Sequence, residues 1–280
     1  MSAGTFLIVD GYPKASRDQF TQVGMGWAGV LYQELLLRHL PGAEPRIWYV
    51  DDQPTPPPDA EIAACRGVLW PGCNQTIYHE NPLVHAMVAT SKAAYAAGVA
   101  QFGSCWGIQM ATFAAGGTVA AHPRGREMGV IRNLMVTPAG QAHPMMKGRA
   151  PVYSHFESHD DIVTRLPPNA VTLAANDWSP VQAAVITHGK GTFWATQYHP
   201  EYDLHQLARL IVAREARLVK GGMFRDHDDL TAYVARLEAL HADPARSDLR
   251  WQLGIGDDLL DPAQREREFA NWVTVEIAKR

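Results

Sequence analysis

Cysteine is scarce in this chain of 280 residues, which contains three: Cys65, Cys73 and Cys105. The odd number excludes a fully paired disulfide framework, and their spacing matches no zinc-ligand pattern such as CxxC. Disulfides persist mainly in oxidising compartments. We therefore expect reduced thiols, no structural metal and a cytoplasmic protein.

A strong charge bias is also missing. The 25 Lys and Arg residues are slightly outnumbered by 29 Asp and Glu residues, and the formal net charge is −4. A solvated helix or loop face explains the two basic pairs, Arg124 with Arg126 and Arg265 with Arg267. Nucleic-acid binding usually needs a basic patch or stripe, so we expect no nucleic-acid partner.

Long apolar runs are absent. The most apolar stretch, Val99–Ala121, is interrupted by glycines and polar residues, whereas a membrane helix needs roughly 20 predominantly apolar residues. The segment Met1–Asp10 has neither a basic region nor an apolar run of signal-peptide length. We expect a soluble protein with no membrane association. There is no internal repeat and no Walker-type phosphate loop.

The first half of the chain alternates short apolar runs with helical patterns. The expected strands are Thr5–Val9, Arg46–Val50, Gly67–Trp70 and Val99–Gly103, and the expected helices are Trp27–Leu40, Pro82–Ala97 and Trp106–Ala115. This alternation predicts a parallel sheet with helices on both faces.

Between Met128 and Ala195 the apolar runs follow one another with only turns between them. The expected strands are Gly129–Val136, Pro151–His155, Ala170–Ala174, Val181–Ile186 and Gly191–Ala195. They predict an antiparallel patch, or an edge added to the main sheet. A helix over His205–Leu218 completes this region.

The residues after Lys220 differ in character, so we predict a boundary there: residues 1–220 form the main domain and residues 221–280 a helical C-terminal extension. Asp228–His241 and Pro262–Lys279 are expected to be amphipathic helices, the second begun by the Asp261-Pro262 pair. The extension has three possible roles in this interpretation: covering a face of the main domain, forming a homodimer contact, or docking a partner.

The most informative segment is Gly103-Ser104-Cys105-Trp106-Gly107, between an expected strand and an expected helix. A nucleophile on such a sharp turn needs small neighbours two residues away, which Gly103 and Gly107 supply. The helix N-terminus favours a thiolate at Cys105, and the N–H of Trp106 is free to face an oxyanion. The structural alternative is a buried cysteine in a glycine-containing turn.

A second segment supplies the partners that a thiol nucleophile needs. In Gln197-Tyr198-His199-Pro200-Glu201, the histidine and the glutamate are two positions apart and project to the same side at a strand end. Glu201 can then orient the imidazole of His199 while the other ring nitrogen faces Cys105. Taken alone, His-x-Glu is more often a surface accident.

Gly-x-Cys-x-Gly-x-Gln followed downstream by His-Pro-Glu resembles the motifs of the class I glutamine amidotransferases. Within that family, the resemblance is greatest to the glutaminase domains of GMP synthetase and anthranilate synthase. The resemblance covers about Thr5–Leu218. It implies an α/β fold: a three-layer, flavodoxin-like sandwich with a mostly parallel central sheet.

The resemblance also implies roles for further residues. Gly72, in Val68-Leu-Trp-Pro-Gly72, would give the second oxyanion N–H beside that of Trp106, and Gln109 would help to hold the substrate. Glu127-Met-Gly129 resembles a Glu-x-Gly turn of the family. Ser158 and His159, followed by Asp160, would bind the α-amino and carboxylate groups of glutamine through their backbone.

By this resemblance, Cys105 attacks the side-chain amide of glutamine, and no metal or organic cofactor is needed. Because no synthetase domain is recognisable, the favoured hypothesis is a subunit that passes ammonia to a separate synthase. One alternative is a stand-alone hydrolase of γ-glutamyl amides or peptides. Another is a catalytically silent binding protein on the same fold.

Three rival patterns remain. Gly24-Met-Gly26-Trp-Ala-Gly29 fits the dinucleotide fingerprint GxGxxG, but the stretch Asp10–Val23 separates it from the first strand. His155 and His159, with the two aspartates that follow, have a spacing that binds zinc on helices, although this stretch has a strand pattern. Cys73 lies near the expected oxyanion turn and is an alternative reactive thiol.

Overall fold

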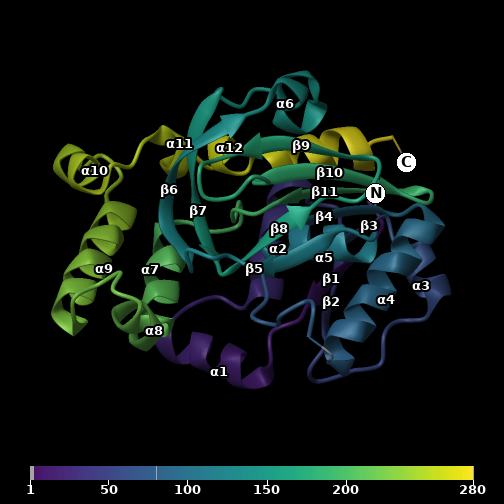
Figure 1. Ribbon diagram of the computed structural model, residues 1–280, viewed down its shortest axis with the longest axis horizontal. Coiled ribbons are helices and arrows are strands. Elements are labelled where there is room, and N and C mark those ends of the chain that lie inside the picture. Colours follow the sequence, from purple (N-terminus) through teal and green to yellow (C-terminus); the bar gives the residue numbers. More distant parts are fainter. Residues whose placement is uncertain (1–2, 80, 280) are drawn as a thin grey trace.

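The computed structural model describes residues 3–79 and 81–279 of the chain. Its main feature is a nine-stranded sheet in the order β2-β1-β3-β4-β11-β10-β9-β6-β7 (Figure 1). These strands are β1 (Thr5–Asp10), β2 (Glu44–Tyr49), β3 (Gly67–Trp70), β4 (Ala100–Ser104), β6 (Glu127–Val136), β7 (Val152–His159), β9 (Ala170–Ala175), β10 (Ala183–His188) and β11 (Gly191–Thr196).

The sheet is parallel in one half and antiparallel in the other. Strands β2, β1, β3, β4 and β11 run parallel, and β10, β9, β6 and β7 continue the sheet as antiparallel neighbours. The predicted antiparallel edge of the main sheet is therefore confirmed. A small second sheet, β5 (Thr118–Ala121) with β8 (Asp161–Arg165), was not predicted, because these short strands have no clear alternation of buried and exposed residues.

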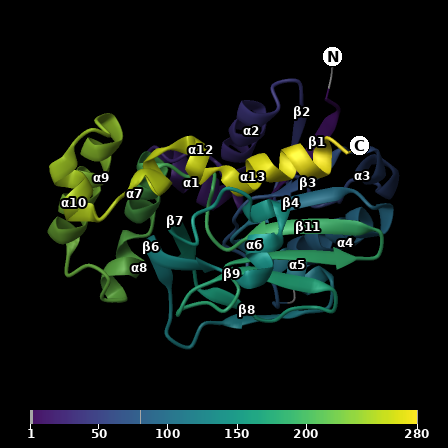
Figure 2. The same ribbon diagram turned by 90° about the horizontal axis from the view of Figure 1, so that it is seen from above.

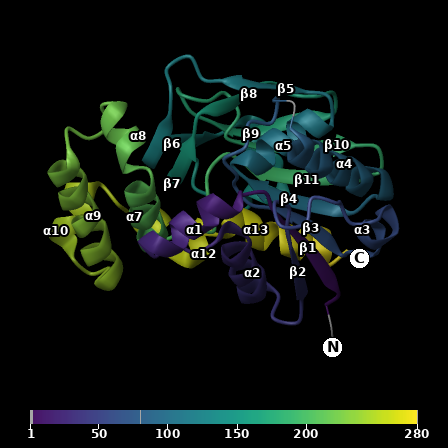
Figure 3. The ribbon, with the colours of Figure 1, turned by 90° about the horizontal axis from the view of Figure 1, so that it is seen from below.

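Helices cover both faces of the sheet (Figures 2 and 3). Up to residue 146 they are α1 (Lys14–Val23), α2 (Ala28–His39), α3 (Asp59–Ala64), α4 (Pro82–Ala97), α5 (Trp106–Ala114), α6 (Pro138–Ala142) and the 3-10 turn η1 (Pro144–Met146). After β11 come α7 (Leu204–Ala213), α8 (Glu215–Lys220), α9 (His227–Ala242), α10 (Ser247–Leu253), α11 (Asp257–Leu260), α12 (Pro262–Arg265), α13 (Arg267–Trp272) and the π-helical turn η2 (Val273–Ile277).

The alternation of side chains along β1 produces two cores. Leu7 and Val9 belong to a cluster with side chains of α4 and α5, whereas Phe6 and Ile8 belong to one with side chains of α2 and α13. Successive side chains of a strand point to opposite faces, so one strand contributes to both cores. The result is the predicted α/β three-layer sandwich.

A third cluster joins α1, α7, α9 and α10 beside the sheet, where Figure 1 shows α9 and α10 at one end of the molecule. The helix predicted over His205–Leu218 is divided at Arg214, whose backbone (φ −108°, ψ 8°) separates α7 from α8. The periodicity did not predict α1, α3, α6, α10 or α11, and all of these except α1 are short.

The C-terminal segment packs into the second core. Trp272 and Phe269 are fully buried there, and the ring of Phe102 in β4 lies 5.1 Å from that of Phe269. The single helix predicted over Pro262–Lys279 is wrong in detail, because the segment is divided at Glu266 into α12, α13 and η2. Arg265 is buried and donates to the carbonyl of Leu259, so a solvated face is a wrong interpretation for this residue.

Within the described residues, no helix combines the length and apolar character required to cross a bilayer.

Candidate active site

The predicted nucleophile turn lies between β4 and α5. Cys105 has a backbone conformation there (φ 54°, ψ −102°) that residues other than glycine seldom adopt. A Cβ added to Gly103 would lie 2.8 Å from Cβ of Trp70, and one added to Gly107 would lie 2.7 Å from the carbonyl oxygen of Trp70. Both glycines therefore let α5 and β4 approach β3. Trp106 begins α5, so its N–H has no acceptor within the helix.

His199 and Glu201 follow the C-terminal end of β11, which neighbours β4. Nδ1 of His199 lies 2.6 Å from Oε1 of Glu201, and both side chains are buried. The hydroxyl of Ser104 donates to the same carboxylate oxygen over 3.1 Å. Tyr202 stacks on the imidazole, with ring centroids 4.1 Å apart and planes 4° from parallel. The ring is thus fixed on two sides.

Gly72, after β3, lies beside both the imidazole of His199 and the side chain of Cys105. An added Cβ would be 2.8 Å from Cε1 of His199 and 3.7 Å from Cβ of Cys105, so the three residues surround one point. Burial alone would lower the pKa of His199, but the charges of Glu201 and Cys105 and the hydrogen bond to Glu201 raise it to about 10. The arrangement favours an imidazolium beside the thiol.

Residues 158–161 form the opposite wall. The thiol of Cys105 points at the carbonyl oxygen of Ser158 over 3.6 Å. The side-chain amide of Gln109 donates to the carbonyl of Asp161 over 3.1 Å, and Nδ1 of His159 lies 3.0 Å from the same oxygen. The structure therefore brings Gln109, Ser158 and His159 together with Cys105 around one cavity.

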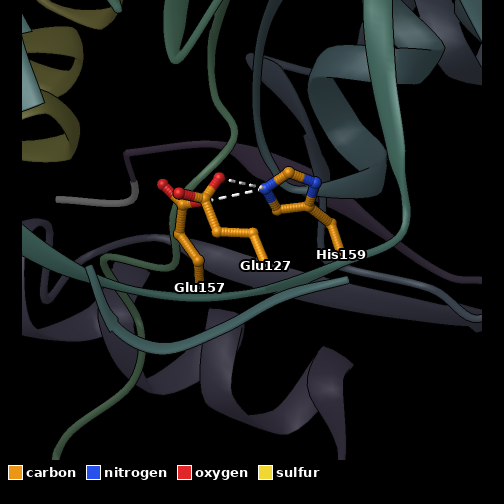
Figure 4. Close-up of side chains that lie close together, drawn as sticks. All are labelled: Glu127, Glu157 and His159. Atoms are coloured by element: carbon orange, nitrogen blue, oxygen red, sulfur yellow. Dashed lines mark hydrogen bonds and ion pairs between the residues drawn. The ribbon is translucent and has the colours of Figure 1, made fainter. Parts of the chain in front are cut away.

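The imidazole of His159 points toward the buried carboxyl groups of Glu127 and Glu157 (Figure 4). Its Nε2 lies 2.7 Å from a carboxylate oxygen of Glu157 and 3.1 Å from one of Glu127. Burial would lower the pKa of His159, but the hydrogen bonds to both glutamates raise it to about 10. Burial raises the pKa of Glu157 to about 7. One cation thus compensates two buried carboxyl groups, and this role for Glu157 was not predicted.

The rival zinc pattern is not assembled. The ring of His155 stacks on Tyr198, 4.3 Å between centroids, and its Nε2 lies 2.9 Å from the carbonyl oxygen of Arg265. The side chains of His155 and His159 therefore contact different neighbours. The three ligand atoms of Glu127, Glu157 and His159 do lie within 4.8 Å of one another, and Nε2 of His159 contacts both carboxyl groups there.

The segment that fits the dinucleotide fingerprint also lacks the geometry of a phosphate-binding turn. Helix α1 separates the segment Gly24–Gly29 from β1. The N–H of Gly29 donates to the carboxylate of Asp10 over 2.9 Å, and the N–H of Gly26 donates to the side chain of Gln206. Both backbone donors are thus occupied by the protein, which favours the interpretation as a glycine-rich entry to a packed helix.

Cys73 lines the same cavity as Cys105. Burial raises the pKa of its thiol well above the ordinary range, and its sulfur accepts a hydrogen bond from the N–H of Gln75 over 3.4 Å. A thiol whose pKa is raised in this way is a poor nucleophile.

The cavity has a volume of about 410 Å³ and a charged mouth. Arg126 and Arg217 both pair with the carboxylate of Asp160, over 2.6 and 2.7 Å, and Arg126 also donates to the hydroxyl of Ser158. A solvated face is therefore a wrong interpretation for Arg126. In the sequence, the position of Arg126 directly before the Glu127-Met-Gly129 turn was the signal that could have identified it. Tyr202 and Ser104 were also missed in the sequence analysis. Each adjoins a residue to which a role was assigned, Glu201 and Cys105 respectively, but received no role itself.

A family model described as "Glutamine amidotransferase class-I" matches residues 39–217, a range that includes Gly72, Cys105, His199 and Glu201. This chain belongs to the class I glutamine amidotransferase family. A relative from Pseudomonas sp., named γ-glutamyl-L-1-hydroxyisopropylamide hydrolase, is 30% identical over 98% of this chain and 94% of the relative.

The chain is also similar to a GMP synthase and to two glutamine amidotransferases of known structure. A GMP synthase from a Nitratiruptor species is 29% identical over 56% of this chain, but the match covers only 29% of that enzyme. A glutamine amidotransferase structure from Thermotoga maritima has a TM-score of 0.63 and 17% identity, covering 100% of this chain and 98% of the other. One from Methylobacillus flagellatus has a TM-score of 0.63 and 19% identity, covering 98% and 95%. At these identities the structures show the fold.

Proposed function

We propose that this protein hydrolyses the amide bond of γ-glutamyl compounds, glutamine among them, through a thioester on Cys105. The observation that carries the proposal is the convergence of Cys105, His199 and Gly72 at the ends of β4, β11 and β3, with Glu201 behind the imidazole. A nucleophile, a base and a group that orients the base are the minimum that this chemistry requires.

In the first half-reaction the Cys105 thiolate attacks the γ-carbonyl carbon. The N–H groups of Trp106 and Gly72 would stabilise the negative oxygen of the tetrahedral intermediate. When that intermediate collapses, the C–N bond breaks and the imidazolium of His199 gives its proton to the leaving nitrogen. A free amine departs, or ammonia if the substrate is glutamine, and a γ-glutamyl thioester remains.

In the second half-reaction His199 removes a proton from a water molecule that attacks the thioester carbon. The C–S bond breaks, glutamate leaves and Cys105 returns as a thiolate. On the far side of the nucleophile, the Ser158–Asp161 backbone and Gln109 would hold the glutamyl part, and the contacts of Gln109 and His159 with the Asp161 carbonyl keep this wall in place. This chemistry needs no cofactor.

The relatives support two leaving groups. The match to the Pseudomonas hydrolase extends over nearly the whole of both chains, which favours a stand-alone enzyme that releases an amine. The family and the GMP synthases favour ammonia release from glutamine to a separate synthase partner. A reducing cytoplasm suits either activity, because the three cysteines are free.

The test is labelling with a γ-glutamyl diazo-ketone, followed by peptide mass mapping, together with assays on glutamine and on a γ-glutamyl anilide. We expect the label on Cys105. Cys105→Ala should lose both the label and the hydrolysis, whereas Cys73→Ala should keep both. Labelling of Cys73 in the native protein, or hydrolysis by Cys105→Ala, would contradict the proposal.

The same assays separate the two leaving groups. A stand-alone hydrolase should cleave γ-glutamyl amides at least tenfold more efficiently than glutamine without any other protein present. A subunit should hydrolyse glutamine slowly on its own and accelerate when its synthase is added.

A further inference from the structure

Ser104 is a buried hydroxyl at a position where the pattern of β4 favours an apolar side chain. It is the last residue of that strand, and Phe102 and Ala100, two and four positions earlier on the same face, belong to the second core. All three side chains are fully buried. Burying a hydroxyl without a hydrogen bond costs free energy, so the partner of Ser104 indicates why it is there.

That partner is the carboxylate that orients the base. The hydroxyl of Ser104 donates to Oε1 of Glu201 over 3.1 Å, and Nδ1 of His199 lies 2.6 Å from the same oxygen. The other carboxylate oxygen, Oε2, is buried and has no hydrogen-bond partner among the residues that the structure describes. One oxygen therefore takes both donors, and a change at Ser104 acts on the atom that holds the imidazole.

The backbone fixes the two segments beside each other. Ser104 lies opposite Thr196 in the parallel pair of β4 with β11, and the N–H of Cys105 donates to the carbonyl of Thr196 over 2.8 Å. The side chains that line the cavity include neither Ser104 nor Glu201. Because the serine lies behind the cavity wall, any effect it has on the reaction must pass through Glu201 and then His199.

A hydrogen bond to a carboxylate takes up part of its negative charge. With Ser104 bound to it, Glu201 stabilises the imidazolium of His199 less than it would with the imidazole as its one donor. This matters because the imidazolium must give its proton to the leaving nitrogen, and a weaker acid gives it more slowly. The hydroxyl also opposes rotation of the carboxylate, so that Oε1 stays directed at Nδ1.

We propose that Ser104 is a positioning residue for the hydrolysis, whose hydroxyl fixes the carboxylate of Glu201 against His199 and shares its negative charge. This inference rests on the proposed function. The proton of Ser104 stays on its own oxygen in both half-reactions, and the serine forms no bond to the substrate. The catalytic arrangement then has four parts: the thiol, the imidazole, the carboxylate and the serine hydroxyl.

The first test is the pH profile of Ser104→Ala, measured on glutamine and on a γ-glutamyl anilide between pH 6 and 11. The imidazolium should be stabilised more strongly, so the basic limb of kcat/KM should move to higher pH by roughly 0.5–1 pH unit. We expect kcat to fall by about 5- to 50-fold and KM to change by less than about threefold, because the lost hydrogen bond to a charged group lies outside the substrate site. A limb that stays in place or moves to lower pH would overturn the inference.

The other titratable groups near this carboxylate do not obscure the limb. Tyr32 in α2 and Tyr202 are fully or almost fully buried. Burial, and with it the charge of Glu201, raises the pKa of both tyrosines well above the usual value. Both hydroxyls therefore stay neutral in most of this pH range, and the limb reports the imidazolium of His199 beside Cys105.

Further variants separate the hydroxyl of Ser104 from the volume of its side chain. Threonine and valine have nearly the same shape and differ in the hydroxyl, so Ser104→Thr should keep kcat and the limb near native, whereas Ser104→Val should resemble Ser104→Ala. Ser91→Ala is the matched control, because Ser91 is equally buried and donates to the side chain of Gln101 in β4. It should keep kcat within about twofold of native and leave the limb in place. Thermal melting of each variant checks the fold.

A double-mutant cycle tests whether Ser104 acts through Glu201. In a Glu201→Gln background the carboxylate charge is gone, so adding Ser104→Ala should lower kcat by less than about twofold instead of about 5- to 50-fold. An equal loss in both backgrounds would place the effect of Ser104 in the nucleophile turn itself and would overturn the inference.

The outcomes separate this inference from the proposed function. Native kinetics in Ser104→Ala, together with an active native protein, would overturn the inference alone. No cleavage of glutamine or the anilide by the native protein would overturn the proposed function.

Discussion

At the scale of single residues, the pKa of His199 depends on two neighbours. Burial lowers it, and the charges of Glu201 and Cys105 raise it from 6.5 to about 10. A raised pKa in the folded state adds stability that is fully present below pH 6.5 and is lost as the pH rises through 10. The same neighbours therefore set the stability and the working pH range.

Glu201→Gln should move the basic limb of the pH profile of kcat/KM to lower pH, because the imidazolium loses the carboxylate that stabilises it. We expect kcat to fall on the order of 10³- to 10⁴-fold, as when the orienting carboxylate of a catalytic triad is replaced. Steady-state kinetics between pH 5 and 10 measure both. Glu238→Gln, at the surface pair of Glu238 with His205, is the control. An unshifted limb would show that Glu201 does not act on His199.

Glu157 offers a second pH-dependent test. Burial raises its pKa from 4.5 to about 7, so its contribution to stability is fully present below pH 4.5 and is lost as the pH rises through 7. Glutamine cannot titrate. As the pH rises from 4.5 to 7, the native protein should therefore lose stability relative to Glu157→Gln, by on the order of 1–3 kcal/mol. Urea unfolding at several pH values measures the difference, and a constant difference would contradict the raised pKa.

At the scale of elements, the junction of β4 and α5 depends on the close approach of β3. Gly107 lies in the first turn of α5, where alanine would normally stabilise a helix by about 0.5–1 kcal/mol. Here the added Cβ would lie 2.7 Å from the backbone oxygen of Trp70, which cannot move without shifting β3. The packing therefore reverses the usual sign of the substitution.

We expect Gly107→Ala to lower the free energy of unfolding by about 1–3 kcal/mol, the usual cost of overpacking, and to lower kcat more than tenfold because Cys105 is two residues away. Urea unfolding and steady-state kinetics check the two effects separately. A variant as stable as the native protein would show that β3 and α5 are not in close contact.

At the scale of the whole molecule, a buried ion pair joins the C-terminal segment to the connection between η1 and β7. Nε of Arg149 lies 2.7 Å from the carboxylate of Glu268 in α13, and the side chains are 2% and 0% exposed. Trp272, in the same helix as Glu268, is buried in the second core. The domain boundary at residue 220 stays a prediction, and these contacts indicate how strongly the two parts depend on each other.

Glu268→Gln should destabilise the protein by roughly 3–5 kcal/mol, because it leaves the charge of Arg149 buried and uncompensated. Replacing both partners, Arg149→Met with Glu268→Leu, should restore most of that loss, since a buried pair contributes little beyond an apolar pair of similar size. Denaturant unfolding of the three proteins checks this. A loss below about 1 kcal/mol in Glu268→Gln would mean that the segment is only loosely attached.

The sequence determined the features that short segments encode. The expected strand Gly67–Trp70 and helix Pro82–Ala97 coincide with β3 and α4, because local periodicity and caps define such elements. Gly103, Cys105 and Gly107 predicted the strained turn, since a sharp strand-to-helix bend restricts which residues fit. His199 and Glu201 were identified from their two-residue spacing taken together with the nucleophile turn.

Only the tertiary structure decided which distant side chains meet. Ser104 donates a hydrogen bond to Glu201, which is 97 positions away in the chain. Arg126 pairs with Asp160 instead of facing solvent. Arg214 has no carboxylate partner among the residues that the structure describes. Arg38 likewise pairs with Glu266, the residue at which the C-terminal helix is divided, across 228 positions. A spacing rule describes neighbours along one element, whereas the charge balance of a cavity depends on how all the elements pack.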